Sequence, residues 1–570
     1  MSQNKACQNC KKSFEILPSD LEFYNRLSVP PPTFCPNCRQ QRRLAFRNER
    51  VLYSRKCDAP GHDENLITTF HPDAPYKVVD SNYWWSDIWD PLEYGRDYDF
   101  SKPFFEQMLE LQKEVPRPNA AIMKSENCDY ANLIAGSKNC YMVVSVERCE
   151  DCYFGARMFY SKDCCDCETI YQSELCYECF QATKCYRCTF SERIENCRDI
   201  HFCYDCQSCN NCFGCTTLRN KNYCFLNEQL EKEDYEKKVA QAKTNTRDGI
   251  ERMEKLAKEA HLKYPRRFVQ IIKSENCLGD NIFNSKNCIN SFTINESKNV
   301  DYSLCVTEGF NVMDASYSDF CEQVYENMSS EHDSRKKFCC FCWECHDVEY
   351  CDSCHSGCSD LFGCIGMSHG QYCVLNKKYS QDEYEKLVGR IKKHMDEMPY
   401  TSKSGHIYKY GEYFPPEFST FAYNETVALE FYPLDKESAL KGGFSWRDSE
   451  EKTRETTLKA DKLPQAIAEV SEEMLEQTIA CEHAGKCSDP CTFAFKIVGR
   501  ELEFYKKMGL PLPTLCPMCR HFERVRLRNP LHLYHRKCMN EGCENEFETT
   551  YAPDRPEKVY CEKCYQQSVV

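Results

Sequence analysis

The centre of the chain repeats small apolar residues between polar ones at fixed intervals, and the apolar residue is most often cysteine. One interval separates Cys128, Cys140, Cys152, Cys164, Cys176 and Cys188, and a shorter one separates Cys188, Cys197, Cys206, Cys215 and Cys224. Polar pairs such as Ser137-Lys138 lie between them, which is typical of short strands joined by tight turns. Stacking such strands buries one face of each, so the pattern predicts a β-solenoid with cysteine and aromatic side chains inside.

This cysteine-rich block occurs twice. Lys-Ser-Glu-Asn-Cys at 124–128 returns at 273–277, and Phe-Gly-Cys at 213–215 returns at 362–364 with the same displacement along the chain. A repeat of this kind predicts two stacked copies, each closed by a charged helix that caps the open end. The first helix is expected from Leu230 to His261, and the second after Ser380, which begins a capping box with Glu383.

Two cysteine pairs at each end of the chain have the spacing of zinc ligands. Cys7 with Cys10, and Cys35 with Cys38, can supply four thiolates at tetrahedral spacing. The same pattern recurs near the other end of the chain, which adds a second complete set. We therefore predict three Zn²⁺ ions, with these C-terminal ligands: Cys487, Cys491, Cys516 and Cys519 for one, and Cys538, Cys543, Cys561 and Cys564 for the other. Cys57 and His62 form half of a fourth site, to which His71 or Asp80 are candidate additions.

Both ends also share an apolar signature around these pairs. Leu-Glu-Phe-Tyr at 21–24 and Pro-Thr-Phe-Cys-Pro-Asn-Cys-Arg at 32–39 resemble a family of uncharacterised zinc-ribbon, treble-clef-like proteins. The resemblance is confined to the two ends of the chain. It implies zinc binding and no particular activity.

The predicted fold is multidomain and mainly β. A zinc-ribbon or treble-clef module at each end flanks the duplicated solenoid and its capping helices, and a helix is also expected from about Pro464 to Ala480. The expected domains are an N-terminal module (1–79), an aromatic connector with a helix (80–116), the two solenoid copies (117–265 and 266–400), a second connector with a helix (401–480), and a C-terminal double module (481–570).

Charge is distributed unevenly along the chain. Residues 1–57 and 484–538 each carry 11 basic and 4 acidic residues, so the remaining residues sum to −29 within a total of −15. Zinc-supported arginine clusters suit phosphate contacts, so we expect the terminal modules to dock on RNA, DNA, a ribosome or a protein partner. Pairing of the same arginines with the acidic centre of the chain is the alternative. The arginines are Arg39, Arg42, Arg43 and Arg47, and Arg520, Arg524, Arg526 and Arg528.

The role of the central cysteines has two interpretations. Where the first copy has Cys149 and Cys152, the second has Ser297 and Val300, a substitution that a packing position tolerates and a metal ligand does not. This favours a non-enzymatic scaffold or adaptor without a catalytic residue or organic cofactor. A redox or metal-handling protein, with iron–sulfur or stored metal at the central thiols, is the alternative, and a zinc site within 339–358 stays open.

The N-terminal residues lack the apolar core of a secretory signal, and no run of about 18 apolar residues follows. The 45 cysteines are then expected in a reducing cytoplasm, as ligands or buried thiols rather than disulfides. No membrane partner is expected.

Overall fold

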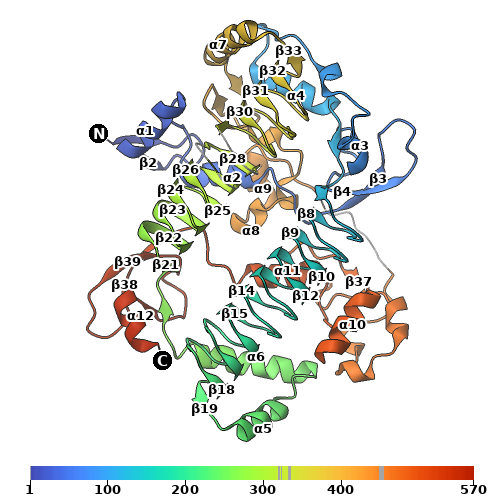
Figure 1. Ribbon diagram of the computed structural model, residues 1–570, viewed down its shortest axis with the longest axis vertical. Helices are drawn as coiled ribbons and strands as arrows, with labels where there is room; N and C mark the ends of the chain where they lie inside the picture. The colour runs from blue at the N-terminus through green and yellow to red at the C-terminus, as the bar shows by residue number, and fades with distance from the viewer. Residues whose placement is uncertain (1, 319–320, 322–323, 331–334, 449–454, 570) are drawn as a thin grey trace.

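Two stacks of short parallel strands form the centre of the molecule, and both chain ends pack against them (Figure 1). This is a computed structural model that describes residues 2–318, 321, 324–330, 335–448 and 455–569. The described chain is mainly β, with helices at the ends of the stacks and in the terminal modules.

The first stack runs from β7 to β19, and its sheets extend along the stack. Its strands up to β18 pair in parallel with a constant register, since Asn132 pairs with Val144 and Val144 pairs with Ala156, and the last strand, β19, pairs antiparallel with β18. One circuit of the chain is therefore as long as the longer of the two cysteine intervals. The strands are β7 (Ile122–Met123), β8 (Asn132–Ala135), β9 (Val144–Glu147), β10 (Glu150–Tyr153), β11 (Ala156–Phe159), β12 (Lys162–Cys165), β13 (Glu168–Tyr171), β14 (Phe180–Thr183), β15 (Glu192–Glu195), β16 (Arg198–His201), β17 (Asn210–Phe213), β18 (Asn222–Phe225) and β19 (Glu228–Gln229).

A backbone pattern that repeats at every third residue produces this circuit. From Lys124 to Leu226 every third residue has a positive φ, for example 53° at Asn127 and 54° at Asn139. The residue after each of these turns inward, so the interior is lined at every third position, as by the buried Cys140 and Cys149. Both cysteine intervals are multiples of this period, which is why the interval changes along the sequence while the geometry does not.

Cysteine fits these interior positions because it is small, apolar and still able to donate a weak hydrogen bond. The thiol of Cys179 donates to the carbonyl oxygen of Cys188 at 3.3 Å, and Cys215 does the same to Cys224 at 3.3 Å. Each of these hydrogen bonds links one side of the stack to a neighbouring side through its interior.

Among its described residues, the second stack repeats the first with two irregular circuits. Glu275 pairs with Lys286, which is one position short of a regular circuit, and His346 pairs with Ser359, which is one position beyond it. The alignment between the two copies therefore shifts by one position at the first irregularity and shifts back at the second. The strands are β21 (Ile271–Ile272), β22 (Glu275–Phe283), β23 (Lys286–Asn295), β24 (Lys298–Asp301), β25 (Leu304–Thr307), β26 (Phe310–Met313), β27 (Ala315–Ser318), β28 (Asn327–Ser330), β29 (Lys336–Lys337), β30 (His346–Glu349), β31 (Ser359–Phe362), β32 (Gln371–Val374) and β33 (Lys377–Lys378).

Each terminal module has two halves, a hairpin with two helices and then a second hairpin. The N-terminal module comprises β1 (Gln3–Ala6), β2 (Ser13–Ile16), α1 (Pro18–Leu27), α2 (Pro36–Leu44), β3 (Tyr53–Lys56), β4 (Asn65–Thr68) and β5 (Val78–Val79). The C-terminal module comprises β36 (Ile479–Ala480), β37 (Ala494–Phe495), α10 (Gly499–Met508), α11 (Pro517–Val525), β38 (Tyr534–Lys537), β39 (Glu546–Thr549), β40 (Val559–Tyr560) and α12 (Glu562–Ser568).

The remaining elements connect the modules to the stacks. They are α3 (Ser81–Trp84), α4 (Phe104–Glu114), β6 (Arg117–Pro118), α5 (Lys232–Ala242), α6 (Arg247–His261), β20 (Arg266–Arg267), α7 (Gln381–Glu397), β34 (Tyr400–Thr401), β35 (Ile407–Tyr408), α8 (Ala428–Phe431) and α9 (Lys436–Lys441), with short 3₁₀ turns η1 (Pro91–Tyr94), η2 (Pro416–Phe418), η3 (Tyr423–Glu425), η4 (Ala460–Lys462), η5 (Ile467–Glu469) and η6 (Glu472–Glu476).

Of the four helices expected outside the terminal modules, two differ in the structure, while α4 lies in the 80–116 connector as expected. The helix expected from Leu230 to His261 is two helices, because Lys243 is left-handed and Thr246 begins α6 as its N-cap. The helix expected from Pro464 is absent from the described residues, since Ile467 and Met474 lie in short 3₁₀ turns packed against the C-terminal module. After Ser380 the expected capping box and helix α7 are present.

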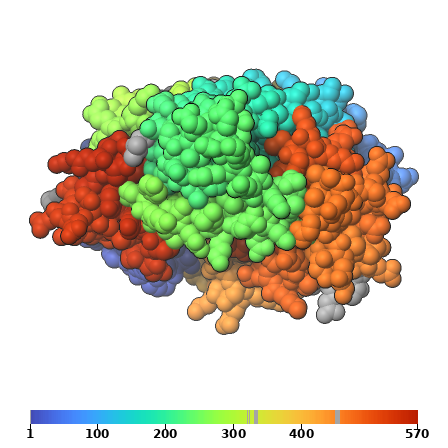
Figure 2. All heavy atoms as spheres, turned by 90° about the horizontal axis from the view of Figure 1, so that it is seen from below, coloured from blue at the N-terminus to red at the C-terminus, as the bar shows by residue number. Residues whose placement is uncertain are grey.

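Both modules hold the two stacks together. In the N-terminal module β5 pairs with β6, at the start of the first stack, and in the C-terminal module β40 pairs with β20, at the start of the second. The other half of each module contacts the opposite stack, as the ion pairs below show. In Figure 2 the C-terminal segments, orange and red, lie on both sides of the green end of the first stack.

Candidate metal centres

Cys7, Cys10, Cys35 and Cys38 come together at the N-terminal end. Their sulfur atoms all lie within 4.8 Å of one another. The first pair lies on the turn between β1 and β2, while Cys35 is the N-cap of α2 and Cys38 lies in the first helical turn. A helix N-terminus favours the thiolate form, so the fold places the second pair where metal binding is easiest.

The corresponding group in the C-terminal module contains a residue that was not predicted from the sequence. Cys481, Cys491, Cys516 and Cys519 lie within 4.8 Å of one another. Cys487, the residue expected there, lies 3.8 Å from the sulfur of Cys519 and belongs to a second group with His483 and Asp489. Spacing alone pointed to Cys487, because the separation between Cys481 and Cys491 is unusually long for one zinc turn.

The third four-cysteine group lies in the last half of the module. Cys538, Cys543, Cys561 and Cys564 have their sulfur atoms within 4.8 Å of one another. Cys561 is the N-cap of α12, which repeats the arrangement of Cys35 on α2. All four of these residues were candidate ligands in the sequence.

A smaller group lies at the equivalent place in the N-terminal module. It consists of Cys57, His62 and Glu64, with Nδ1 of His62 2.7 Å from the Glu64 carboxylate. The two additions considered from sequence serve other roles: Asp80 accepts a hydrogen bond from the backbone N–H of Asn82, and His71 accepts one from Asp73. This group therefore offers three donors.

The surroundings of the four-cysteine groups suit bound thiolates. The backbone N–H groups of Cys35, Cys516 and Cys561 each lie 3.3 Å from the sulfur of the first cysteine of their group. Side-chain amides of Asn9 and Asn540 donate to Cys38 and Cys564 at 3.3 Å. N–H donors to sulfur stabilise the charge of metal-bound thiolates. The donor set and its hydrogen bonds thus fit a soft divalent ion such as Zn²⁺.

The arginines of the two modules are turned toward the stacks. Arg39 and Arg43 share Asp314, at 2.8 and 3.1 Å, and Arg42 lies 2.6 Å from Glu326. In the C-terminal module Arg520 and Arg524 share Asp166, at 2.7 and 3.0 Å, and Arg524 also reaches Glu178 at 3.2 Å. Arg47 pairs with Glu49, Arg528 with Glu168 and Glu430, and Arg526 with Asp489. Only Arg526, 53% exposed, presents its side chain largely to solvent among these eight.

Aromatic contacts repeat along with the ion pairs. Tyr24 packs on Tyr325 at 5.1 Å between ring centroids, and Tyr505 packs on Tyr177 at 5.8 Å. Tyr24 and Tyr505 occupy equivalent positions of the two modules, and Tyr325 and Tyr177 occupy equivalent positions of the two stacks. The two interfaces are therefore copies of one another.

Most of the central cysteines are buried, among them Cys224 and Cys373. Burial raises the pKa of Cys224 to about 11 and that of Cys373 to about 12. Among the described residues, none of the groups of three or more candidate ligands includes a residue of 339–358. The thiols of this segment instead donate to backbone carbonyls, as Cys342 does to Cys351 at 3.4 Å.

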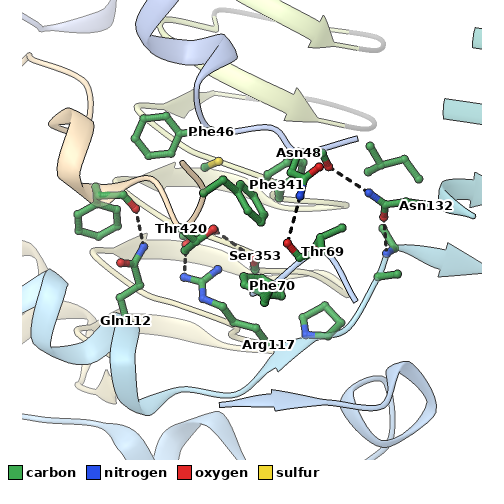
Figure 3. Close-up of a pocket in the computed structure, with 18 of the residues that line it drawn as sticks. Phe46, Asn48, Thr69, Phe70, Gln112, Arg117, Asn132, Phe341, Ser353 and Thr420 are labelled. Carbon is green, nitrogen blue, oxygen red and sulfur yellow. Dashed lines mark hydrogen bonds and ion pairs between the residues drawn. The ribbon is translucent and has the colours of Figure 1, made fainter. Parts of the chain in front are cut away.

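A small cavity lies where the N-terminal module meets both stacks (Figure 3). Its volume is about 70 Å³, far below the roughly 300–1,000 Å³ of ordinary ligand pockets. Polar side chains that line the cavity already interact with one another or with the backbone. Arg117 lies 2.6 Å from Asp352, and Asn48 donates to the carbonyl of Thr69. The cavity is a junction between three parts of the fold.

No protein-family model matches the chain, and no curated protein matches it significantly. Among the described residues, no helix is both long and apolar enough to cross a membrane.

Proposed function

We propose that the protein is a zinc-binding, non-enzymatic scaffold in which two terminal modules of the zinc-ribbon kind clamp a duplicated cysteine-rich β-solenoid. The observation that carries this proposal is the convergence of four cysteine sulfurs in each of three groups. Four thiolates in tetrahedral reach select Zn²⁺ among common divalent ions. Each ion would fix one half of a module and, through it, the contact with a stack.

The arginine contacts support a protein partner for this scaffold over a nucleic acid. Phosphate recognition needs accessible guanidinium groups, and seven of the eight candidate arginines are held with little exposure against carboxylates within the chain. Binding RNA, DNA or a ribosome through these arginines would break their ion pairs between the modules and the stacks. We therefore propose that the adaptor surface lies elsewhere and recognises protein.

The alternative, a redox or metal-handling role for the central thiols, is less well supported. A reactive cysteine requires an accessible thiolate, whereas most of the central cysteines are buried. A reducing compartment such as the cytoplasm, expected from the sequence, is part of this proposal; the 45 cysteines form no disulfide among the described residues.

Metal analysis of the full chain tests the proposal. Protein purified under reducing conditions without added metal should contain zinc, lack iron and show no visible absorbance. Cys35→Ser, Cys516→Ser and Cys561→Ser should each reduce the zinc content, whereas Cys305→Ser, outside every four-cysteine group, should leave it unchanged. Zinc content that none of the three substitutions alters, or an iron–sulfur band, would overturn the proposal.

A further inference from the structure

Two groups of candidate ligands in the C-terminal module share one cysteine. Cys481, Cys491, Cys516 and Cys519 form the first, and His483, Cys487, Asp489 and the same Cys519 form the second. In each group all donor atoms lie within 4.8 Å of one another. We propose that this module binds two divalent metal ions bridged by the thiolate of Cys519. The inference rests on the proposed zinc function and adds a second ion to one of its sites.

The number of donors fits a bridged pair of tetrahedral ions. Two such ions that share one ligand need three further ligands each, and the two groups supply seven different residues. With a Zn–S distance of about 2.3 Å, two sulfurs on one tetrahedral ion lie about 3.8 Å apart. The sulfur of Cys519 lies 3.8 Å from that of Cys481 and 3.8 Å from that of Cys487. The sulfur of Cys519 therefore lies at the distance from each group that is expected for a ligand shared by two ions.

The extra donors lie on an insertion that the N-terminal module lacks. Only two residues separate Cys7 from Cys10, whereas nine separate Cys481 from Cys491. Cys7 and Cys481 are structural equivalents, because each accepts the backbone N–H at the start of the following helix at 3.3 Å. The added residues carry His483, Cys487 and Asp489.

The side chains of His483 and Asp489 are placed as metal ligands. His483 has a ring nitrogen without a partner in the described part of the chain, and Asp489 has a carboxylate that an arginine orients. Nδ1 of His483 is buried and has no hydrogen-bond partner among the described residues. A buried ring nitrogen without a partner is costly unless a ligand completes it. Nη2 of Arg526 lies 2.6 and 2.7 Å from the two oxygens of Asp489, which orients that carboxylate and places a positive charge beside the cluster.

Charge balance also favours two ions. Five thiolates and one carboxylate around a single divalent ion would leave a net charge of −4, whereas two ions reduce it to −2. Arg526 offsets part of this remainder. The second ion therefore relieves repulsion that one ion would leave among closely spaced anionic ligands.

Native mass spectrometry and elemental analysis of the full chain test the inference. His483→Ala and Cys487→Ser should each lose one zinc equivalent relative to the natural sequence, with the other ions retained. His532→Ala, at an exposed histidine of the same module, is the matched control and should lose none. Retention of the other ions shows that the variant is still folded.

The outcomes separate this inference from the proposed function. If Cys516→Ser loses zinc but His483→Ala and Cys487→Ser retain the full count, the second ion does not exist while the scaffold proposal stands. If Cys35→Ser, Cys516→Ser and Cys561→Ser all retain the full count as well, both fail. As a second measurement, cadmium-113 replacement should give two resonances coupled through Cys519, and a single uncoupled resonance from this cluster would contradict the bridge.

Discussion

Nη1 of Arg520, in the last module of the chain, lies 2.7 Å from Oδ2 of Asp166 in the first stack. The duplicate of this pair joins Arg39, in the first module, to Asp314 in the second stack at 2.8 Å. The contacts are thus crossed: each terminal module docks its arginines on the stack that is farther from it in sequence. Because the other half of each module pairs with the start of the nearer stack, the two modules close the chain into a ring.

The ion pairs at these interfaces should be essential to stability where they are buried. Asp166→Asn is expected to destabilise the fold by about 3–5 kcal/mol, since it leaves Arg520 and Arg524 buried beside a neutral partner. Asp163, on the preceding turn of the same circuit, has the same left-handed backbone but pairs with a half-exposed Lys507 at 3.0 Å. Asp163→Asn should therefore change stability by no more than about 1 kcal/mol.

Denaturant unfolding of both variants measures this difference. Limited proteolysis should also show the C-terminal module of Asp166→Asn released first. Equal stabilities for the two variants would mean that the arginine contacts do not hold the module in place.

Metal removal is expected to affect the modules more than the stacks. Structural zinc contributes on the order of 10–16 kcal/mol in small fingers, comparable with the total stability of a domain. Chelation should therefore unfold both terminal modules and expose the carboxylates of Asp166 and Asp314, while interior strand pairs survive. Hydrogen exchange followed by mass spectrometry distinguishes the regions. Loss of protection in the stacks at the same chelator concentration would argue that the stacks cannot persist alone.

Interior cysteines should tolerate replacement by an apolar residue of similar size. Cys152 corresponds to Val300 in the second stack, and both side chains are fully buried. Cys152→Val is expected to cost less than about 1.5 kcal/mol, as volume-conserving core substitutions do. Cys152→Asp should cost several kcal/mol, because it buries an unpaired carboxylate. Thermal unfolding compares the two, and severe destabilisation by valine would instead indicate a specific role for the thiol.

Acid should weaken the contact between the N-terminal connector and the second stack through His355. Its ring packs against Trp84 and Trp85 at 4.5 and 4.6 Å, and burial lowers its pKa to about 4. An unfolded histidine has a pKa near 6.5, so protonation favours the unfolded chain. The stability contributed by the neutral ring is present above about pH 6.5 and falls by on the order of 3 kcal/mol as the pH approaches 4.

Replacement of His355 by phenylalanine keeps an aromatic ring and removes the titration. The stability of His355→Phe should fall less between pH 6.5 and 4 than that of the natural sequence, as followed by tryptophan fluorescence. Zinc release in acid is common to both proteins and cancels in the comparison. His532→Phe, at an exposed position, should show the natural pH dependence. An unchanged slope for His355→Phe would show that this ring does not titrate on unfolding.

The sequence by itself determined the local chemistry. Cysteine spacing identified every member of the three four-cysteine groups except Cys481, because ligands on one tight turn must be close in sequence. The duplication and the regular cysteine interval likewise predicted a backbone that repeats along the chain. The capping box at Ser380 specified the start of α7 from neighbouring residues alone.

Tertiary structure decided which of these local features meet. Cys481 belongs to its group although an insertion separates it from Cys491, and sequence spacing does not predict how that insertion folds. Cys487 belongs to the neighbouring group instead. The arginines looked free to bind phosphate, yet their partners Asp166 and Asp314 lie far away along the chain. Only the folded chain brings such groups together, because burial makes an unpaired guanidinium costly and the nearest carboxylates belong to the stacks.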